Sequence, residues 1–247
     1  MALPAPIPGL RFRSAARTDA GAVRTHNEDQ FLDRPEARLW AVADGMGGHQ
    51  DGAAASNLII DALGALGAFG SGYAFLTGVT EALTAANQAL VIRAAQFSEG
   101  AVTGATVVAL LIEEAHAACV WAGDSRAYHL DGGVLRRMTR DHSLLQELVD
   151  SGALSPDAAA IDRRSNIVTR AVGAAAELEL DRAFAAVQAG DRFLLCSDGL
   201  TGMVTDDEIA EALRASDPDA AADLLLALAL GRGATDNVTL VVIEALG

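Results

Sequence analysis

The sequence predicts an α+β domain in which antiparallel sheets are covered by helices. Short β-type runs occur in clusters and do not alternate one by one with helices, which argues against a parallel sheet. Turn signals divide these runs, and Asp131-Gly132-Gly133 is typical of a hairpin turn. Longer segments rich in Ala and Leu flank the runs and have the length of helices. Hydrophobic residues make up 51% of the 247 residues, so a sizeable core can form.

The predicted strands are short apolar runs bounded by turn residues. They cover 11–18, 39–43, 105–114, 116–123, 125–138, 192–197 and 237–246. The run at 125–138 contains the hairpin turn. The run at 192–197, RFLLCS, is typical of a buried strand.

The predicted helices cover 53–69, 76–97, two short pieces within 141–160, 206–215 and 218–230. The end of the first helix and the connection to the second are marked by Gly64, Gly67, Gly70 and Gly72. Residues 1–10 are rich in Pro and predict a flexible tail. No linker or repeat divides the rest, so residues 11–247 are expected to form a single domain.

The charged residues exclude several classes of function. The formal net charge is −15, and every basic residue is Arg, because the chain contains no Lys. A P-loop, a protein kinase and a Schiff-base enzyme each need a Lys, so these three classes are excluded. The strong acidity also argues against nucleic-acid binding, which depends on cations that neutralise phosphates. A phosphate-binding site in this chain would need metal ions or a few placed Arg residues.

The cysteines and the apolar runs indicate a soluble cytoplasmic protein. Cys119 and Cys196 stand in apolar runs and are expected to be buried, reduced thiols. No CxxC motif supports a thiolate zinc site. No apolar run approaches the ~18 residues that a membrane span needs, and the first residues lack the pattern of a signal peptide.

Four aspartates stand at the ends of apolar strands. Asp44, Asp124 and Asp198 follow the runs LWAVA, ACVWAG and FLLCS, and Asp236 precedes NVTLVVI. Strands of a shared sheet can bring such ends together, and carboxylates that converge need a compensating cation. Oxygen ligands without Cys or His favour Mg²⁺ or Mn²⁺. Ordinary turn chemistry is the better explanation of any one of these residues taken alone, but it explains all four together poorly.

Seven segments resemble, in this order, the metal-dependent type 2C (PPM) Ser/Thr protein phosphatases, particularly the bacterial ones. They are RTHNED at 24–29, ADGMGGH at 43–49, TGATVV at 103–108, GDSR at 123–126, TRDHS at 139–143, CSDGL at 196–200 and TDNVTLVV at 235–242. The resemblance extends from about residue 11 to the end of the chain. It implies a four-layer α/β/β/α sandwich, with two antiparallel sheets flanked by helix pairs, and makes 11–247 a single phosphatase catalytic domain.

The resemblance also implies a set of metal ligands. Asp44 would bridge two Mn²⁺ or Mg²⁺ ions, and the carbonyl of Gly45 would bind the first. Asp198 and Asp236 would bind the second. Asp124, together with Asp198, matches the position that binds a third and weaker ion in bacterial members. A glycine suits position 45 because a backbone without Cβ can approach an ion closely.

Further residues are assigned by the same resemblance. Arg24 would bind the substrate phosphate. Glu28 would orient metal-bound water, and Asp29 would hold the Arg24 loop or serve a simple structural purpose. Two positions depart from the family pattern. Gly202 stands where many relatives have an Asp, which weakens the expected second or third metal site. Met46 stands where some relatives have a His proposed as general acid, and Met cannot donate a proton.

The implied activity is hydrolysis of phosphoserine and phosphothreonine in proteins, by direct attack of a hydroxide held between the two metal ions. The alternative is a phosphatase-like binding module with little or no turnover, which the loss of the Asp at position 202 suggests. The implied partners are phosphorylated proteins, among them a cognate Ser/Thr kinase and its substrates. A monomer is the expected state.

Overall fold

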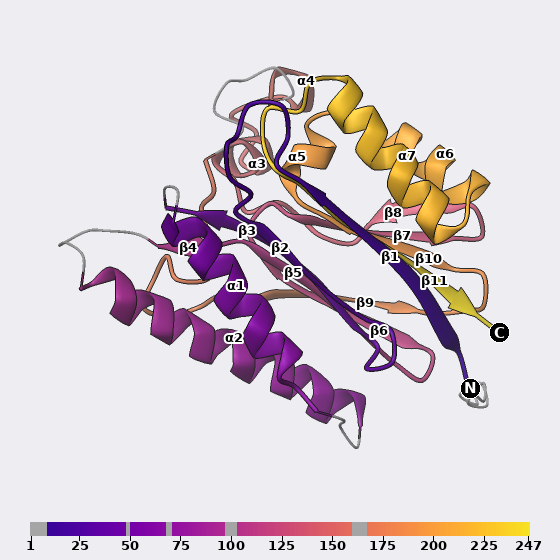
Figure 1. Cartoon of the computed structure of the whole chain (residues 1–247), viewed down its shortest axis with the longest axis horizontal. Coiled ribbons are helices and arrows are strands. Elements are labelled where there is room, and N and C mark those ends of the chain that lie inside the picture. Colours follow the sequence, from indigo (N-terminus) through magenta and orange to yellow (C-terminus); the bar gives the residue numbers. More distant parts are fainter. Residues whose placement is uncertain (1–8, 48–49, 68–70, 97–102, 160–166) are drawn as a thin grey trace.

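The computed structural model describes residues 9–47, 50–67, 71–96, 103–159 and 167–247. Two antiparallel sheets pack face to face, and helices cover the outer face of each (Figure 1). The first sheet consists, in spatial order, of β1 (Arg11–Asp19), β11 (Val238–Leu246), β10 (Arg192–Cys196), β7 (Arg126–Asp131) and β8 (Val134–Arg137). The second sheet consists of β2 (Asp29–Arg34), β3 (Leu39–Met46), β5 (Val107–Glu113), β6 (His116–Ala122) and β9 (Asp181–Ala186), and β4 (Gly104–Ala105) pairs with β3.

Each sheet has its own pair of long helices. The second sheet is covered by α1 (Gln50–Gly64) and α2 (Gly72–Ala94), and the first by α6 (Asp206–Ala215) and α7 (Pro218–Gly231). Three short helices complete the described part: α3 (Leu144–Asp150), α4 (Pro156–Ala159) and α5 (Asp198–Thr201). Within that part, none of the helices has the length and apolar character needed to span a membrane. The predicted α+β class and its four layers are confirmed.

The core has three layers because both faces of each sheet are buried. In β3, Trp40 and Val42 face the other sheet, while Ala41 and its alternate neighbours face α1 and α2. A strand that is buried on both faces is apolar throughout. This explains why the run LWAVA carries no polar residue before Asp44. The polar side chain appears where the strand leaves the core.

The sequence located most strands but not the two at the edges of the second sheet. The predicted hairpin is confirmed, since β7 and β8 pair across Gly132 and Gly133, whose φ angles are 55° and 81°. The strands β2 and β9 were not predicted. Both are edge strands of the second sheet. Partly buried and exposed residues alternate along β9, and all residues of β2 except the first are only partly buried, so neither strand shows a strong apolar run.

The helices differ from the prediction mainly at their ends. The first helix ends at Gly64 rather than at 69, and the second begins at Gly72 rather than at 76. The earlier start follows from Ser71, whose side chain caps the helix by accepting a hydrogen bond from Ala74 N. Residues 1–8 of the predicted tail, residues 68–69 of the first predicted helix and Phe97 of the second lie outside the described residues.

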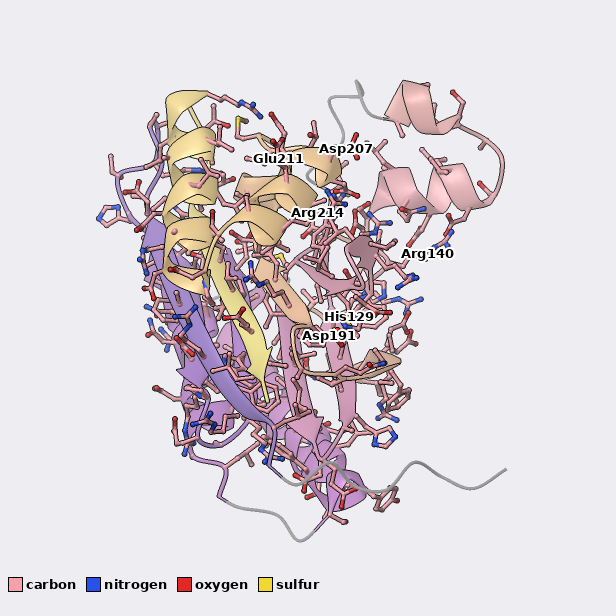
Figure 2. The ribbon with its side chains drawn as sticks, turned by 90° about the vertical axis from the view of Figure 1, so that its right-hand side faces the viewer. His129, Arg140, Asp191, Asp207, Glu211 and Arg214 are labelled. Carbon is pink, nitrogen blue, oxygen red and sulfur yellow. The ribbon has the colours of Figure 1, made fainter. Side chains whose placement is uncertain are left out.

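The helix α6 shows how the outer layers are fixed. Its N-terminus carries a capping box formed by Thr205 and Glu208. Its exposed side carries Asp207, Glu211 and Arg214 (Figure 2), while the opposite side is buried on the first sheet. This spacing of three to four residues is the expected pattern of an amphipathic helix.

One polar pair is buried in the core away from the strand ends described below. His129 of β7 and Asp191, just before β10, point toward one another (Figure 2), with 3.0 Å between His129 Nε2 and Asp191 Oδ2. The His129 ring stacks on Phe193 at a centroid distance of 4.3 Å. The hydrogen bond allows both polar groups to remain inside the sandwich.

Candidate metal centre

The four strand-end aspartates line one cavity of about 570 Å³. Asp44 belongs to β3 and Asp124 follows β6, so both come from the second sheet. Asp198 follows β10 and Asp236 precedes β11, so both come from the first sheet. The cavity therefore lies where the ends of the two sheets meet. The other predicted site residues that line it are Arg24, Glu28 and Gly45.

The carboxyl groups of the cavity raise one another's pKa. Withdrawal from solvent raises the pKa of Asp44 well above its usual value, and the charges of Asp29 and Asp198 raise it further. Burial, followed by the charge of Asp236, raises the pKa of Asp198, while a hydrogen bond with Asp44 lowers it. Burial, followed by the charge of Asp198, raises the pKa of Asp124 to about 7. Such a cluster gains stability from any cation that enters it.

The donors present fit a hard divalent ion. The cavity offers carboxylate and carbonyl oxygens, and Asp198 Oδ1 is buried without a hydrogen-bond partner. An orphaned acceptor of this kind costs free energy unless a cation or donor satisfies it. Within the described residues, no group of three or more Asp, Glu, His or Cys side chains is arranged in this structure so that it could hold a metal ion by itself. Asp236 Oδ2 accepts a hydrogen bond from Arg24 Nη2 at 2.8 Å.

The backbone at Gly45 is packed too tightly for a side chain. A Cβ atom there would lie 2.2 Å from the carbonyl oxygen of Gly52 and 2.7 Å from that of Glu28. The N–H of Gly45 also donates to Glu28 O at 3.2 Å. The chain after Asp44 can follow this path only because residue 45 has no Cβ.

Substitution of Gly45 by Ala is therefore expected to lower the free energy of unfolding by about 1–3 kcal/mol, as in other overpacked sites. Both clashing atoms belong to the backbone and cannot move aside cheaply. Urea denaturation of the purified variant measures the loss. Gly231→Ala is the matched control, because a Cβ at Gly231 meets nothing within 4 Å. Equal midpoints for the two variants would contradict the expectation.

Arg24 reaches the cavity from an exposed loop between β1 and β2. Its side chain is 56% exposed, and its ion pair with Asp236 places the guanidinium at the cavity wall. The hydrogen bond to Asp236 and the charge of that carboxylate raise the pKa of Arg24, which is cationic at any physiological pH. A permanent cation beside a cluster of carboxylates can bind a phosphate that a metal ion also holds.

Asp29 lies beneath the cavity rather than in its wall. It is 2% exposed and stands opposite Asp44 in the β2–β3 register. Its Oδ2 accepts a hydrogen bond from Ser197 Oγ at 2.8 Å, which joins the two sheets below the aspartates. Burial raises the pKa of Asp29 to about 7, against hydrogen bonds from Ser197 and Thr239 that lower it.

The position of Asp124 is fixed by hydrogen bonds to the preceding residue, Gly123. Gly123 adopts φ 117°, and its N–H donates to His142 Nδ1 at 3.1 Å. His142 N in turn donates to Gly123 O at 2.9 Å, and His142 Nε2 lies 3.2 Å from Asp181 Oδ2. The segment after β8 is thus tied directly to the residue before Asp124.

Three polar residues that support the site had no role assigned from the sequence. Thr106 Oγ1 accepts from Asp44 N at 3.3 Å and lies 2.7 Å from Ser125 Oγ. Asn237 hydrogen-bonds to the Arg24 loop through its amide. Thr106, Ser125 and Asn237 all stand inside motifs that the sequence displays, so membership of a motif was the available signal.

The two departures from the family pattern differ in position. Met46 lines the cavity. Gly202 is not among the cavity-lining residues; it ends α5, and its N–H donates to Asp198 O at 2.7 Å.

Comparison with known proteins agrees with this geometry. The family pattern described as protein phosphatase 2C matches residues 21–225. The chain belongs to this family. Among its relatives is the serine/threonine protein phosphatase PstP of Mycobacterium tuberculosis, 39% identical over 235 residues. That match covers 95% of this chain but only 45% of the length of PstP. The serine/threonine phosphatase stp of Listeria monocytogenes is 35% identical, over 92% of this chain and 94% of stp.

Solved structures of the 2C family have the same fold. PppA, described as a key regulatory component of T6SS in Pseudomonas aeruginosa, is 44% identical, with a TM-score of 0.89 over 96% of this chain and 98% of PppA. The catalytic domain of PstP in complex with two manganese ions is 38% identical, with a TM-score of 0.86 over 97% of this chain and 100% of that domain. The resemblance to bacterial 2C phosphatases that the seven motifs indicated is confirmed.

Proposed function

We propose that this 2C-family chain is a metal-dependent protein phosphatase that hydrolyses phosphoserine and phosphothreonine. The observation that carries the proposal is the convergence of four aspartates from two sheets on one cavity beside Arg24. The names of the relatives, serine/threonine phosphatases with 35–39% identity, support the same reaction. Residues 11–247 are proposed to form its single catalytic domain.

The proposed metal ligands are oxygens of the cavity. Asp44, the carbonyl of Gly45, Asp198 and Asp236 would hold two Mn²⁺ or Mg²⁺ ions, and Asp124 with Asp198 would hold a third, weaker one. The oxygen-only donor set favours these ions over Zn²⁺, and the two manganese ions in the PstP structure support the number. When bound, such ions supply Lewis-acid activation of water and neutralise charge on phosphate.

The chain's own residues would bind and orient the substrate. Arg24 would hold two phosphate oxygens with its planar guanidinium and stabilise the charge that develops on them. Glu28, on the cavity wall, would accept hydrogen bonds from ordered water. Asp29, with its bond from Ser197, would keep β2 in place below Asp44. Met46 offers no proton for the leaving group, so another group must supply it.

A binding module without turnover is the weaker candidate. The feature that suggested it, Gly202, lies outside the cavity wall. The five charged residues proposed to act in the reaction all line the cavity: Arg24, Asp44, Asp124, Asp198 and Asp236.

The proposed partners are phosphorylated proteins, including a cognate Ser/Thr kinase and its substrates. We place the protein in the cytoplasm, as a monomer. The two free cysteines, Cys119 and Cys196, are both buried, and burial raises the pKa of both thiols, which supports a reducing compartment in which no disulfide is needed.

The test is release of phosphate from a phosphothreonine peptide, measured with Mn²⁺ and after EDTA. Turnover is expected with Mn²⁺ and is expected to disappear with EDTA, because the cluster of carboxylates alone would repel the substrate. Mg²⁺ in place of Mn²⁺ shows which ion supports the higher rate. Equal rates with and without EDTA would refute a metal-dependent reaction, and no turnover under any condition would favour the binding module.

A further inference from the structure

The loop at 20–28, between β1 and β2, carries Arg24 but has little packing of its own. The side chains at 22–26 are all exposed. Apolar burial therefore does not fix the backbone of this loop. In Figure 1 the loop lies beside the segment that leads from α7 into β11. The backbone bond from Ala22 N to Ala234 O, 2.7 Å long, joins the two segments.

The side chain of Asn237 makes three hydrogen bonds, all of them to this loop. Its Oδ1 accepts from Glu28 N at 2.8 Å, and its Nδ2 donates to Ala20 O and to His26 O, both at 3.0 Å. These bonds lie on both sides of Arg24 in the sequence. Asn237 is 6% exposed, and the amide uses both of its donors and its acceptor carbonyl on one loop.

We propose that Asn237 is a positioning residue for Arg24, which holds the loop so that the guanidinium meets the phosphate in the cavity. This inference rests on the proposed function, in which Arg24 binds phosphate. The Arg24 side chain is more than half exposed, so its own contacts restrain it weakly. The backbone from which it projects must be fixed instead, because catalysis loses rate when a binding group is displaced by about 1 Å. Asn237 adjoins Asp236 and so ties the Arg24 loop to the wall that carries the predicted metal ligands.

The other contacts act at the two ends of the loop and do not replace the bonds from Asn237. Gly45 N and Ser56 Oγ donate to Glu28 O at 3.2 Å and 2.5 Å. Gly21 N donates to Asp19 Oδ1 at 2.8 Å, and Asn27 Nδ2 donates to Thr18 Oγ1 at 2.7 Å. Both bonds run back to β1, next to the loop in the chain. Together with the Ala22 bond, Asn237 joins the loop to the 234–237 segment, which enters the neighbouring strand β11.

The test is a double-mutant cycle on phosphate binding. The four proteins are wild type, Asn237→Asp, Arg24→Ala and the double variant, each loaded with Mn²⁺. Calorimetry with inorganic phosphate measures the affinity of each. Asp keeps the shape of Asn and the bond from Glu28 N, but it cannot donate to the two carbonyls. Asn237→Asp is expected to weaken phosphate binding about tenfold when Arg24 is present, and less than twofold when Arg24 is absent.

A second buried asparagine provides the matched control. Asn87 of α2 makes the same three kinds of bond to another loop: its Nδ2 donates to Ala175 O and Ala176 O, and its Oδ1 accepts from Gly173 N. Asn87→Asp is expected to lower the melting temperature much as Asn237→Asp does, yet to change phosphate affinity less than twofold. A purely structural effect would act alike in both variants.

Three results would overturn the inference. These are an equal loss of affinity with and without Arg24, an equal loss in Asn87→Asp, or no loss in Arg24→Ala alone. Asn237→Ser is the second variant if Asn237→Asp does not fold, and failure of both to fold would show that Asn237 serves the fold itself. The proposed function is tested separately by turnover. A wild type that binds phosphate through Arg24 but hydrolyses no phosphopeptide would refute the function and leave the cycle interpretable.

Discussion

Replacing Asp44 with Asn is expected to reduce turnover of a phosphothreonine peptide by about a thousandfold or more, a rise of roughly 4 kcal/mol in the barrier. Asp44 is the carboxyl that faces the charges of Asp29, Asp198, Asp124 and Asp236. A divalent ion bound to Asp44 would therefore relieve the repulsion of the whole cluster. Asn keeps the size of Asp but removes the charge. Phosphate release at saturating Mn²⁺ measures the loss, and Asp236→Asn is expected to behave alike.

The fold of the variant provides an internal check. The raised pKa of Asp44 means that its ionised form costs stability once the pH exceeds the unfolded-state pKa. The metal-free Asn variant should therefore be at least as stable as metal-free wild type at neutral pH. Asp61→Asn, on the exposed side of α1, is the control and should keep wild-type turnover. Full activity in Asp44→Asn and Asp236→Asn would remove the basis for a metal centre on these carboxylates.

Mn²⁺ at a hundred times its dissociation constant is expected to raise the free energy of unfolding by ~2.7 kcal/mol. For a chain of this length that corresponds to roughly 5–10 °C in melting temperature. The cause is relief of the mutual repulsion that raises the pKa of Asp44, Asp124 and Asp198 in the absence of a cation. Thermal denaturation with Mn²⁺, and again after EDTA, measures the shift.

The Asp44→Asn protein is the matched control for this measurement. If Mn²⁺ acts at the cavity, the variant should show a much smaller shift than wild type. An equal shift in both proteins would place the stabilising ion elsewhere. A melting temperature that EDTA leaves unchanged in the metal-loaded wild type would contradict the metal centre altogether.

The convergence of the four aspartates could be predicted because each ends or begins a strand with a strong signal. Burial on both faces makes β3, β10 and β11 largely apolar, so the polar residues next to each apolar run mark the end of the sheet. The strands β2 and β9 lack that signal because nearly all of their residues are only partly buried or exposed. Register could not be predicted either, so the sequence did not show that Asp29 lies opposite Asp44.

The supporting polar residues were beyond sequence reasoning for a different reason. Asn237 contacts Ala20, 217 positions away, and Ser197 contacts Asp29, 168 positions away. Nothing in the local pattern of either segment specifies these partners. Motif membership indicated that position 237 matters, but only the fold shows which backbone atoms its amide meets.

The pairing of β1 with β11 has a consequence for synthesis of the protein. β1 runs antiparallel to β11 from Arg11 opposite Leu246 to Asp19 opposite Val238, and in the described sheet it pairs with no other strand. During synthesis on the ribosome, β1 therefore has no partner strand until more than two hundred further residues have been made. Asp236 and Asn237 are synthesised immediately before β11, the strand with which β1 pairs. The candidate site is therefore complete only after residues 236–246 have been made and β11 has joined the sheet.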